Sequence, residues 1–146
     1  MKRFSRRFLS GILALMMISS ILCTTASAAV QSSAYLDAYR AMLTADPHGE
    51  MVITVDVSGA GRMSKLGVNT ICVYESTNGT DFYWIATYEK EDYPGMMGSG
   101  TVFYEDVITF QGVVGRYYYA TAFVYAGNST GGDERACDTA IKRARA

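Results

Sequence analysis

Hydrophobic and polar residues alternate along most of the chain after residue 49, as they do in strands that have one buried face. In residues 50–57, methionine, isoleucine and valine occupy every second position, and the Ser-Gly-Ala-Gly sequence at 58–61 is expected to end this strand. Similar runs separated by turn sequences predict four further strands, at residues 68–75, 82–88, 102–110 and 135–143.

The strongest strand signal is the Tyr-Tyr-Tyr-Ala-Thr-Ala-Phe-Val-Tyr-Ala sequence at residues 117–126. Successive side chains of a strand point to opposite faces, so one face carries the larger aromatic residues and the other carries mostly small residues. We expect a central strand whose small residues face the core and admit large residues such as Trp84 and Ile53. Its tyrosine face then becomes an outer surface.

Residues 31–44 fit two patterns. Tyr35, Tyr39, Met42 and Leu43 match one face of a helix, and the alanines favour a helix, but the segment also alternates as a strand does. The pattern therefore predicts six strands, with a seventh if this segment is extended. It indicates an all-β fold, a seven-strand antiparallel β-sandwich, with a closed barrel as the alternative.

The first 28 residues have the pattern of a secretory signal peptide. Four basic residues precede an apolar run from Phe8 to Leu22, and an Ala-Ser-Ala sequence ends at Ala28. We expect cleavage after Ala28, which leaves a single domain at residues 29–146 and a secreted, extracellular protein.

Loss of this leader changes the charge. It contains 4 of the 13 Lys and Arg residues and none of the 14 acids, so the rest has 9 basic and 14 acidic residues, a net charge of about −5. Nucleic acids and anionic membranes need a basic surface, so neither is an expected partner after cleavage.

Two stretches resemble fibronectin type III domains, which are immunoglobulin-like sandwiches. The Ala-x-Ala-x-Val-x-Ala-x-Asn-x-x-Gly sequence at residues 120–131 resembles the family's sixth strand and exit turn, and residues 75–82 resemble its third-to-fourth strand hairpin. In that family a tyrosine starts the sixth strand. The family spacing places it at Ala120 here, and the nearest candidate is Tyr118.

The chain after the leader also looks like a group of small secreted bacterial proteins of uncharacterised function. The shared motifs are Gly-x-Met-x-x-Leu-Gly, Glu-Ser-x-x-Gly, Pro-Gly-Met-Met, Gly-x-Tyr-Tyr and Gly-Gly-Asp, at residues 61–67, 75–79, 94–97, 115–118 and 131–133. This resemblance implies that residues 31–44 form a first strand, and it brings no known activity with it.

Two cysteines, Cys72 and Cys137, follow the leader. Export and an even count favour a disulfide. However, parity points Cys72 outward and Cys137 inward, and in a type III-like sandwich the strand at 117–126 would separate their Cα atoms. The pairing is left open, and a disulfide would require a different strand order.

The sequence predicts no catalytic, cofactor-binding or metal-binding residue. The single histidine, His48, lies in a turn, and the two cysteines lack the spacing of a zinc site. Acidic residues cluster at 89–92, 105–106 and 133–134 without a calcium-loop spacing, and they leave a small secreted hydrolase with a carboxylate pair as an alternative.

All eleven tyrosines follow the leader, and exposed tyrosine and tryptophan on a rigid sheet suit contact with sugars or proteins. We therefore expect a noncatalytic binding module for an extracellular protein or glycan; a cell-surface structural subunit is a further alternative. The expected binding residues are three strand tyrosines and three residues of the 89–100 loop: Tyr117, Tyr119, Tyr125, Tyr93, Met96 and Met97.

Overall fold

The computed structural model describes residues 33–146, so the expected signal peptide lies outside the described residues. The chain from Ser32 onward forms one compact unit. It contains two short 3-10 helices, η1 (Pro47–Gly49) and η2 (Pro94–Met96), and none of the helices in the described part is long and apolar enough to cross a membrane. The strands are β1 (Leu36–Ala45), β2 (Glu50–Met63), β3 (Lys65–Ser76), β4 (Tyr83–Glu89), β5 (Met97–Gly98), β6 (Thr101–Gln111), β7 (Tyr117–Asn128), β8 (Gly131–Asp138) and β9 (Lys142–Arg143).

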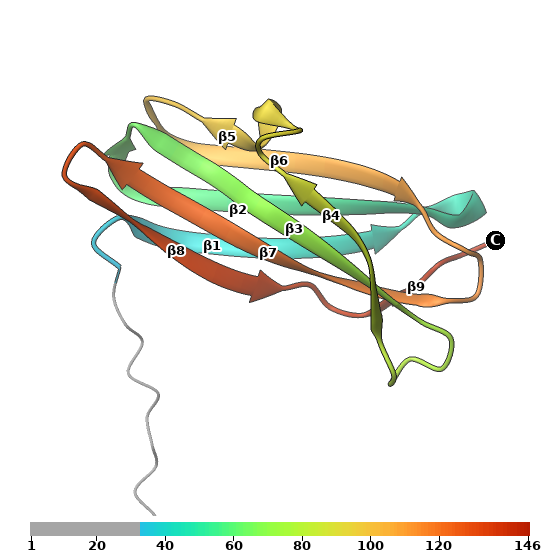
Figure 1. Ribbon diagram of the computed structural model, residues 1–146. Coiled ribbons are helices and arrows are strands. Elements are labelled where there is room, and N and C mark those ends of the chain that lie inside the picture. Colours follow the sequence, from blue (N-terminus) through green and yellow to red (C-terminus); the bar gives the residue numbers. More distant parts are fainter. Residues whose placement is uncertain (1–32) are drawn as a thin grey trace, which may run out of the picture. The chain divides into compact units, whose positions relative to one another are not determined.

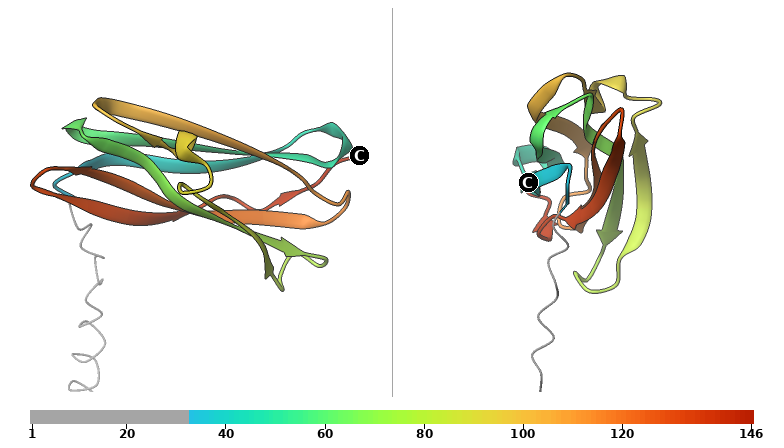
Figure 2. Two further views of the ribbon diagram at one scale, coloured as in Figure 1. Left: turned by 45° about the horizontal axis from the view of Figure 1, so that its top comes forward. Right: turned by 90° about the vertical axis from the view of Figure 1, so that its left-hand side faces the viewer.

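The strands form two antiparallel sheets (Figure 1). The first sheet has the order β1-β2-β6, and the second has the order β4-β3-β7-β8, with β5 added to β3 and β9 added to β7. Figure 2 shows the two sheets as separate layers. The predicted all-β, antiparallel two-layer architecture is therefore confirmed, and the alternative of one closed barrel is not.

The core lies between the two layers, and β7 supplies its small side. Tyr118 and the small residues that follow it at every second position, Ala120, Ala122, Val124 and Ala126, are all fully buried. The apolar residues of β2 that share one parity, Met51, Ile53, Val55 and Val57, are also fully buried. β7 is a central strand between β3 and β8, so both its predicted position and its predicted core face are confirmed.

The segment at residues 31–44, which fits both a helix pattern and a strand pattern, forms a strand from Leu36 onward. β1 pairs with β2 in antiparallel register from Leu36 to Ala45, and it buries Leu36 and Leu43 in the core. The expected end of β2 at residues 58–61 is wrong. Ser58 pairs with Phe103 and Met63 pairs with Thr101, so β2 carries extra residues there, and a bulge accommodates its glycines without ending the strand.

The expected single last strand at residues 135–143 is also wrong. The strand begins earlier, at Gly131, and ends at Asp138 as β8. Strand pairing then resumes only in the two residues of β9. The reason lies at Thr139, where the side-chain hydroxyl accepts the N–H of Ala120 at 3.0 Å and the backbone N–H donates to the Ala120 carbonyl at 2.9 Å. A side chain thus replaces one carbonyl of the ladder.

Cys72 and Cys137 are both free thiols. Cys72 on β3 pairs with Thr121, and Cys137 on β8 pairs with Ala122, so β7 lies between them. Ala122 is buried in the core, whereas Thr121 points to the opposite face of the strand. The two thiols therefore lie on different strands and different faces, and the disulfide that the sequence left open does not form in this strand order.

Candidate functional site

The outer face of the β4-β3-β7-β8 sheet carries an aromatic row, which consists of Trp84, Tyr74 and Tyr119. Tyr74 on β3 pairs with Trp84 on one side and with Tyr119 on the other. Directly opposed residues of antiparallel strands share a face, so the three rings extend across three neighbouring strands. This face points away from the core because Tyr118, the neighbour of Tyr119, is buried.

Trp84 is the most exposed large hydrophobic residue of the described chain, with 62% of its surface accessible. The expectation that it lies in the core is wrong because β4 contains a bulge. Val73 pairs with Ala86 and Tyr74 pairs with Trp84, which leaves Ile85 as an extra residue and reverses the parity of Trp84. The indole Nε1 donates a hydrogen bond to Thr87 Oγ1 at 2.9 Å, which orients the exposed ring.

The middle of the aromatic row is packed. The rings of Tyr74 and Tyr119 stack with centroids 4.7 Å apart and an interplanar angle of 9°, and Phe82 meets Tyr119 edge-on at 4.9 Å. Burial, together with nearby Cys72 and Tyr119, raises the pKa of Tyr74. These contacts hold the row rigid beside the exposed indole.

The other two predicted tyrosines, Tyr117 and Tyr125, share this face and make contacts within the chain. Tyr117 lies 5.7 Å below the guanidinium carbon of Arg143, in a cation–π contact. The Tyr125 hydroxyl lies against the β7–β8 hairpin, where a Cβ at Gly132 would come within 2.2 Å of it. Both tyrosines are half-buried, and they share the outer face of β7 with Tyr119.

A pocket of about 290 Å³ opens beside Tyr125, lined by Lys65, Asn69, Lys90, Met97 and Tyr125. Asn69 lies at a register shift of β3, where its side-chain oxygen accepts a hydrogen bond from Lys90 Nζ at 2.7 Å. Two predicted binding residues, Met97 and Tyr125, thus meet in one pocket. Its polar residues were not predicted, since no motif marks a bulge at Asn69.

The remaining two predicted residues lie elsewhere. Tyr93 is 45% exposed and meets Tyr88 edge-on at 5.4 Å. Met96 is only 1% exposed, so its side chain packs in the core and offers almost no surface to a partner. The absence of a side chain at Gly67 lets this loop close onto β3, because a Cβ there would lie 2.3 Å from the Met96 carbonyl oxygen.

The strand carboxylates that the hydrolase alternative would need point apart. Glu105 and Asp106 are successive residues of β6, and Asp133 and Glu134 are successive residues of β8, so each pair faces opposite sides. Burial raises the pKa of Asp106, while the backbone N–H of Val107 acts against this rise. Within residues 33–146, no group of three or more histidine, cysteine or acidic residues could hold a metal ion.

A buried carboxylate that the sequence did not indicate ties β3 to the start of β7. Glu75 is 6% exposed and accepts hydrogen bonds from Tyr118, Tyr83 and Arg116. Burial alone would raise the pKa of Glu75, but hydrogen bonds from the two tyrosines and Arg116 bring it below its ordinary value. The Tyr118 hydroxyl also accepts the Val113 backbone N–H at 2.8 Å, so this group holds the β6–β7 corner in place.

Neither the models of known protein families nor the curated proteins give a match to this chain.

Proposed function

We propose that the protein is a secreted, noncatalytic binding module that recognises an extracellular protein or glycan through the aromatic row. The observation that carries the proposal is the position of Trp84. This ring is 62% exposed, and a hydrogen bond to Thr87 orients it beside a rigid stack. A large, oriented aromatic ring provides contact area and loses little conformational freedom on binding.

The proposed frame is a fibronectin type III-like sandwich. Three features support it: two sheets built on three and four long strands, the sixth long strand at the centre of the larger sheet, and the corner at Tyr118. In immunoglobulin-like domains a tyrosine near the start of that strand bonds the backbone a few residues upstream. Tyr118 makes such a bond to Val113, although the type III spacing falls on Ala120.

The proposal is tested by comparing two equally conspicuous aromatic residues on opposite sheets. Trp84→Ala removes the exposed indole, whereas Phe103→Ala removes a ring that is 55% exposed on β6 of the other sheet. The chain from Ala29 onward is immobilised and probed with extracellular protein fractions and with a panel of polysaccharides. A bound partner is then titrated against each variant.

We expect the partner to bind the original chain and Phe103→Ala with equal affinity. Trp84→Ala should weaken its binding by about 30-fold or more, which corresponds to about 2 kcal/mol for a central aromatic contact. Equal binding to all three chains would refute the role of the aromatic row. A loss with Phe103→Ala alone would move the binding surface to the other sheet.

A further inference from the structure

A second candidate site lies at the end of the sandwich opposite the β7–β8 hairpin (Figure 1). Three segments meet there through backbone hydrogen bonds. Gly49 N donates to the Arg145 carbonyl at 2.8 Å, Gly112 N donates to the Gly49 carbonyl at 2.8 Å, and Gly115 N donates to the Ala144 carbonyl at 3.0 Å. The surface at this end is therefore assembled from η1, the β6–β7 connection and the segment that follows β8.

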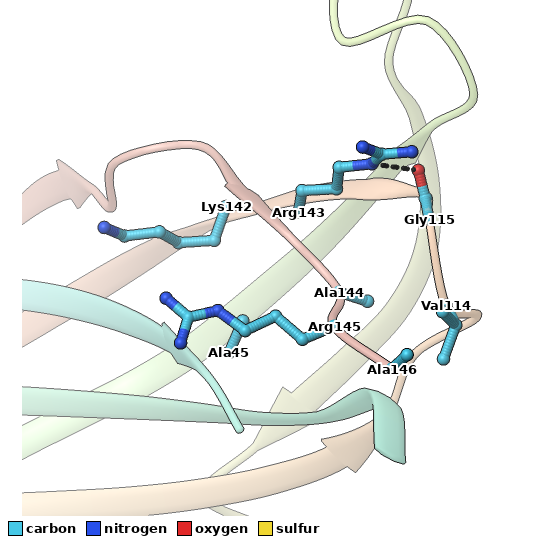
Figure 3. Close-up of a pocket in the computed structure, with 8 residues that line it drawn as sticks. All are labelled: Ala45, Val114, Gly115, Lys142, Arg143, Ala144, Arg145 and Ala146. Atoms are coloured by element: carbon cyan, nitrogen blue, oxygen red, sulfur yellow. Dashed lines mark hydrogen bonds between the residues drawn. The ribbon is translucent and has the colours of Figure 1, made fainter. Parts of the chain in front are cut away.

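This end contains a pocket of about 560 Å³ (Figure 3). Its walls are largely apolar, and its charged side chains are all basic. The lining residues are Ala45, Val114, Gly115, Lys142, Arg143, Ala144, Arg145 and Ala146. The acids nearest to Ala45 in sequence, Asp46 and Glu50, are not among the lining residues. The pocket thus combines an apolar wall with positive charge.

Two of the three cations face the same side. Figure 3 shows Lys142 and Arg145 directed one way, while Arg143 turns toward Gly115. Arg143 already donates from Nε to the Gly115 carbonyl at 3.0 Å and covers the Tyr117 ring. The ion pairs of the described residues involve neither Lys142 nor Arg145, and both side chains are exposed. Their charges are therefore available to a ligand.

Exposed apolar side chains flank these cations. Val113 is 51% exposed, Val114 is 50% exposed and Ile141 is 51% exposed. Val114 lines the pocket itself, and Ile141 directly precedes Lys142. Three of the nine basic residues after the leader fall within positions 142–145, although that part of the chain has a net charge of about −5. The local charge is thus opposite in sign to the net charge.

We propose that this pocket binds an amphipathic anion, independently of the aromatic row. Its carboxylate or phosphate head contacts Lys142 and Arg145, because charged hydrogen bonds to an ammonium and a guanidinium suit either group. Its apolar part packs along Val114 and the alanines of the wall. The ligand is either a free molecule, such as a fatty acid, or an anionic lipid that stays in a bilayer.

The test uses the chain from Ala29 onward, which contains the whole compact unit. Binding of dodecanoate and dodecyl phosphate is measured by titration calorimetry, with dodecanol and inorganic phosphate as probes that lack either the charge or the chain. Vesicles of phosphatidylglycerol and of phosphatidylcholine form the second arm, measured by co-sedimentation. The variant is Lys142→Gln/Arg145→Gln, and its control is Arg40→Gln/Arg62→Gln, which removes the same charge at exposed positions on β1 and β2.

We expect one of the two anionic amphiphiles or the phosphatidylglycerol vesicles to bind. The Lys142→Gln/Arg145→Gln variant should weaken this binding about tenfold or more, while the control should retain it. Binding of vesicles alone identifies a bilayer lipid as the source, and binding of the free amphiphile identifies a soluble one. The proposal is overturned if neither binds, if inorganic phosphate binds as well as dodecyl phosphate, or if both double variants lose binding equally. Unfolding temperatures of both variants show that the fold is retained.

Discussion

Removal of the Tyr118 hydroxyl tests which hydrogen bonds hold the larger sheet to the β6–β7 corner. Tyr118→Phe keeps the buried ring and removes only the oxygen, which donates to Glu75 and accepts the Val113 N–H. A hydrogen bond to a charged group contributes about 1.5–3 kcal/mol to stability. The expected cost is about 2 kcal/mol, or about 8 °C in melting temperature for a domain of this size.

The cost should depend on pH with a definite sign. The pKa of Glu75 in the folded chain lies below its ordinary value of 4.5, because hydrogen bonds and the Arg116 charge outweigh burial. The stability that this carboxylate contributes is therefore present above pH 4.5 and is lost as pH falls through the lower, folded value. At the basic end, burial and the Glu75 hydrogen bond raise the pKa of Tyr118 to about 12 from 10.0, so its contribution is present below pH 10.0 and lost as pH rises toward 12.

Urea unfolding at about pH 7 and about pH 3 provides the measurement. The cost of Tyr118→Phe should be about 2 kcal/mol near neutrality and smaller at the acid pH, because protonation of Glu75 replaces a charged hydrogen bond with a neutral one, which contributes about 1 kcal/mol. Tyr39→Phe, on a ring that is 39% exposed, is the matched control and should change stability by less than about 0.5 kcal/mol. A cost below that of the control, or the same cost at both pH values, would refute the reasoning.

Three other predictions concern the core and its edge. Gly67→Ala should destabilise the fold by about 1–3 kcal/mol, because its Cβ would lie 2.3 Å from the Met96 carbonyl oxygen. A Cβ at Gly61 meets nothing within 4 Å, so equal shifts of the urea midpoint in Gly67→Ala and Gly61→Ala would contradict this. Asp106→Val should stabilise the fold by about 1 kcal/mol at neutral pH, because burial raises the pKa of this inward carboxyl and its ionised form costs stability increasingly above pH 3.8. Since β6 is an edge strand, the variant should also self-associate in sedimentation velocity. A gain in stability that stays constant down to about pH 3 would count against the argument. Burial raises the pKa of the Cys137 thiol to about 11 from 9.0. At about pH 8, a disulfide reagent should therefore label Cys137 about 100-fold more slowly in the folded chain than in urea. Equal labelling rates would show that the thiol is accessible.

The two sheets and the core face of β7 follow from side-chain parity, because a strand that keeps its register also keeps its faces. Parity fails where a strand carries an extra residue. The bulge at Ile85 moves Trp84 from the expected core to the surface, and the one at Asn69 places an amide beside a pocket. Thr139 interrupts the last strand through a hydroxyl bond that depends on a partner 19 residues earlier. Such contacts are tertiary, so no local pattern reveals them.

The candidate site was predicted in outline only. The tyrosine face of β7 lies where the pattern predicts, but its rings pack against Tyr74, Arg143 and the glycines of the next turn. Met96 belongs to the 89–100 loop that the sequence singles out, and its burial depends on the close approach of that loop to Gly67. The residue that carries the proposed function, Trp84, is the one that the sequence assigned to the interior.

Trp84 is the only tryptophan of the chain, so its fluorescence reports on the aromatic row alone. The most direct measurement is acrylamide quenching of this residue with and without a saturating amount of the captured partner. The exposed indole should be quenched readily in the free chain and protected in the complex, and Phe103→Ala should show the same protection. Unchanged quenching at saturation would contradict the claim that the aromatic row is the binding surface.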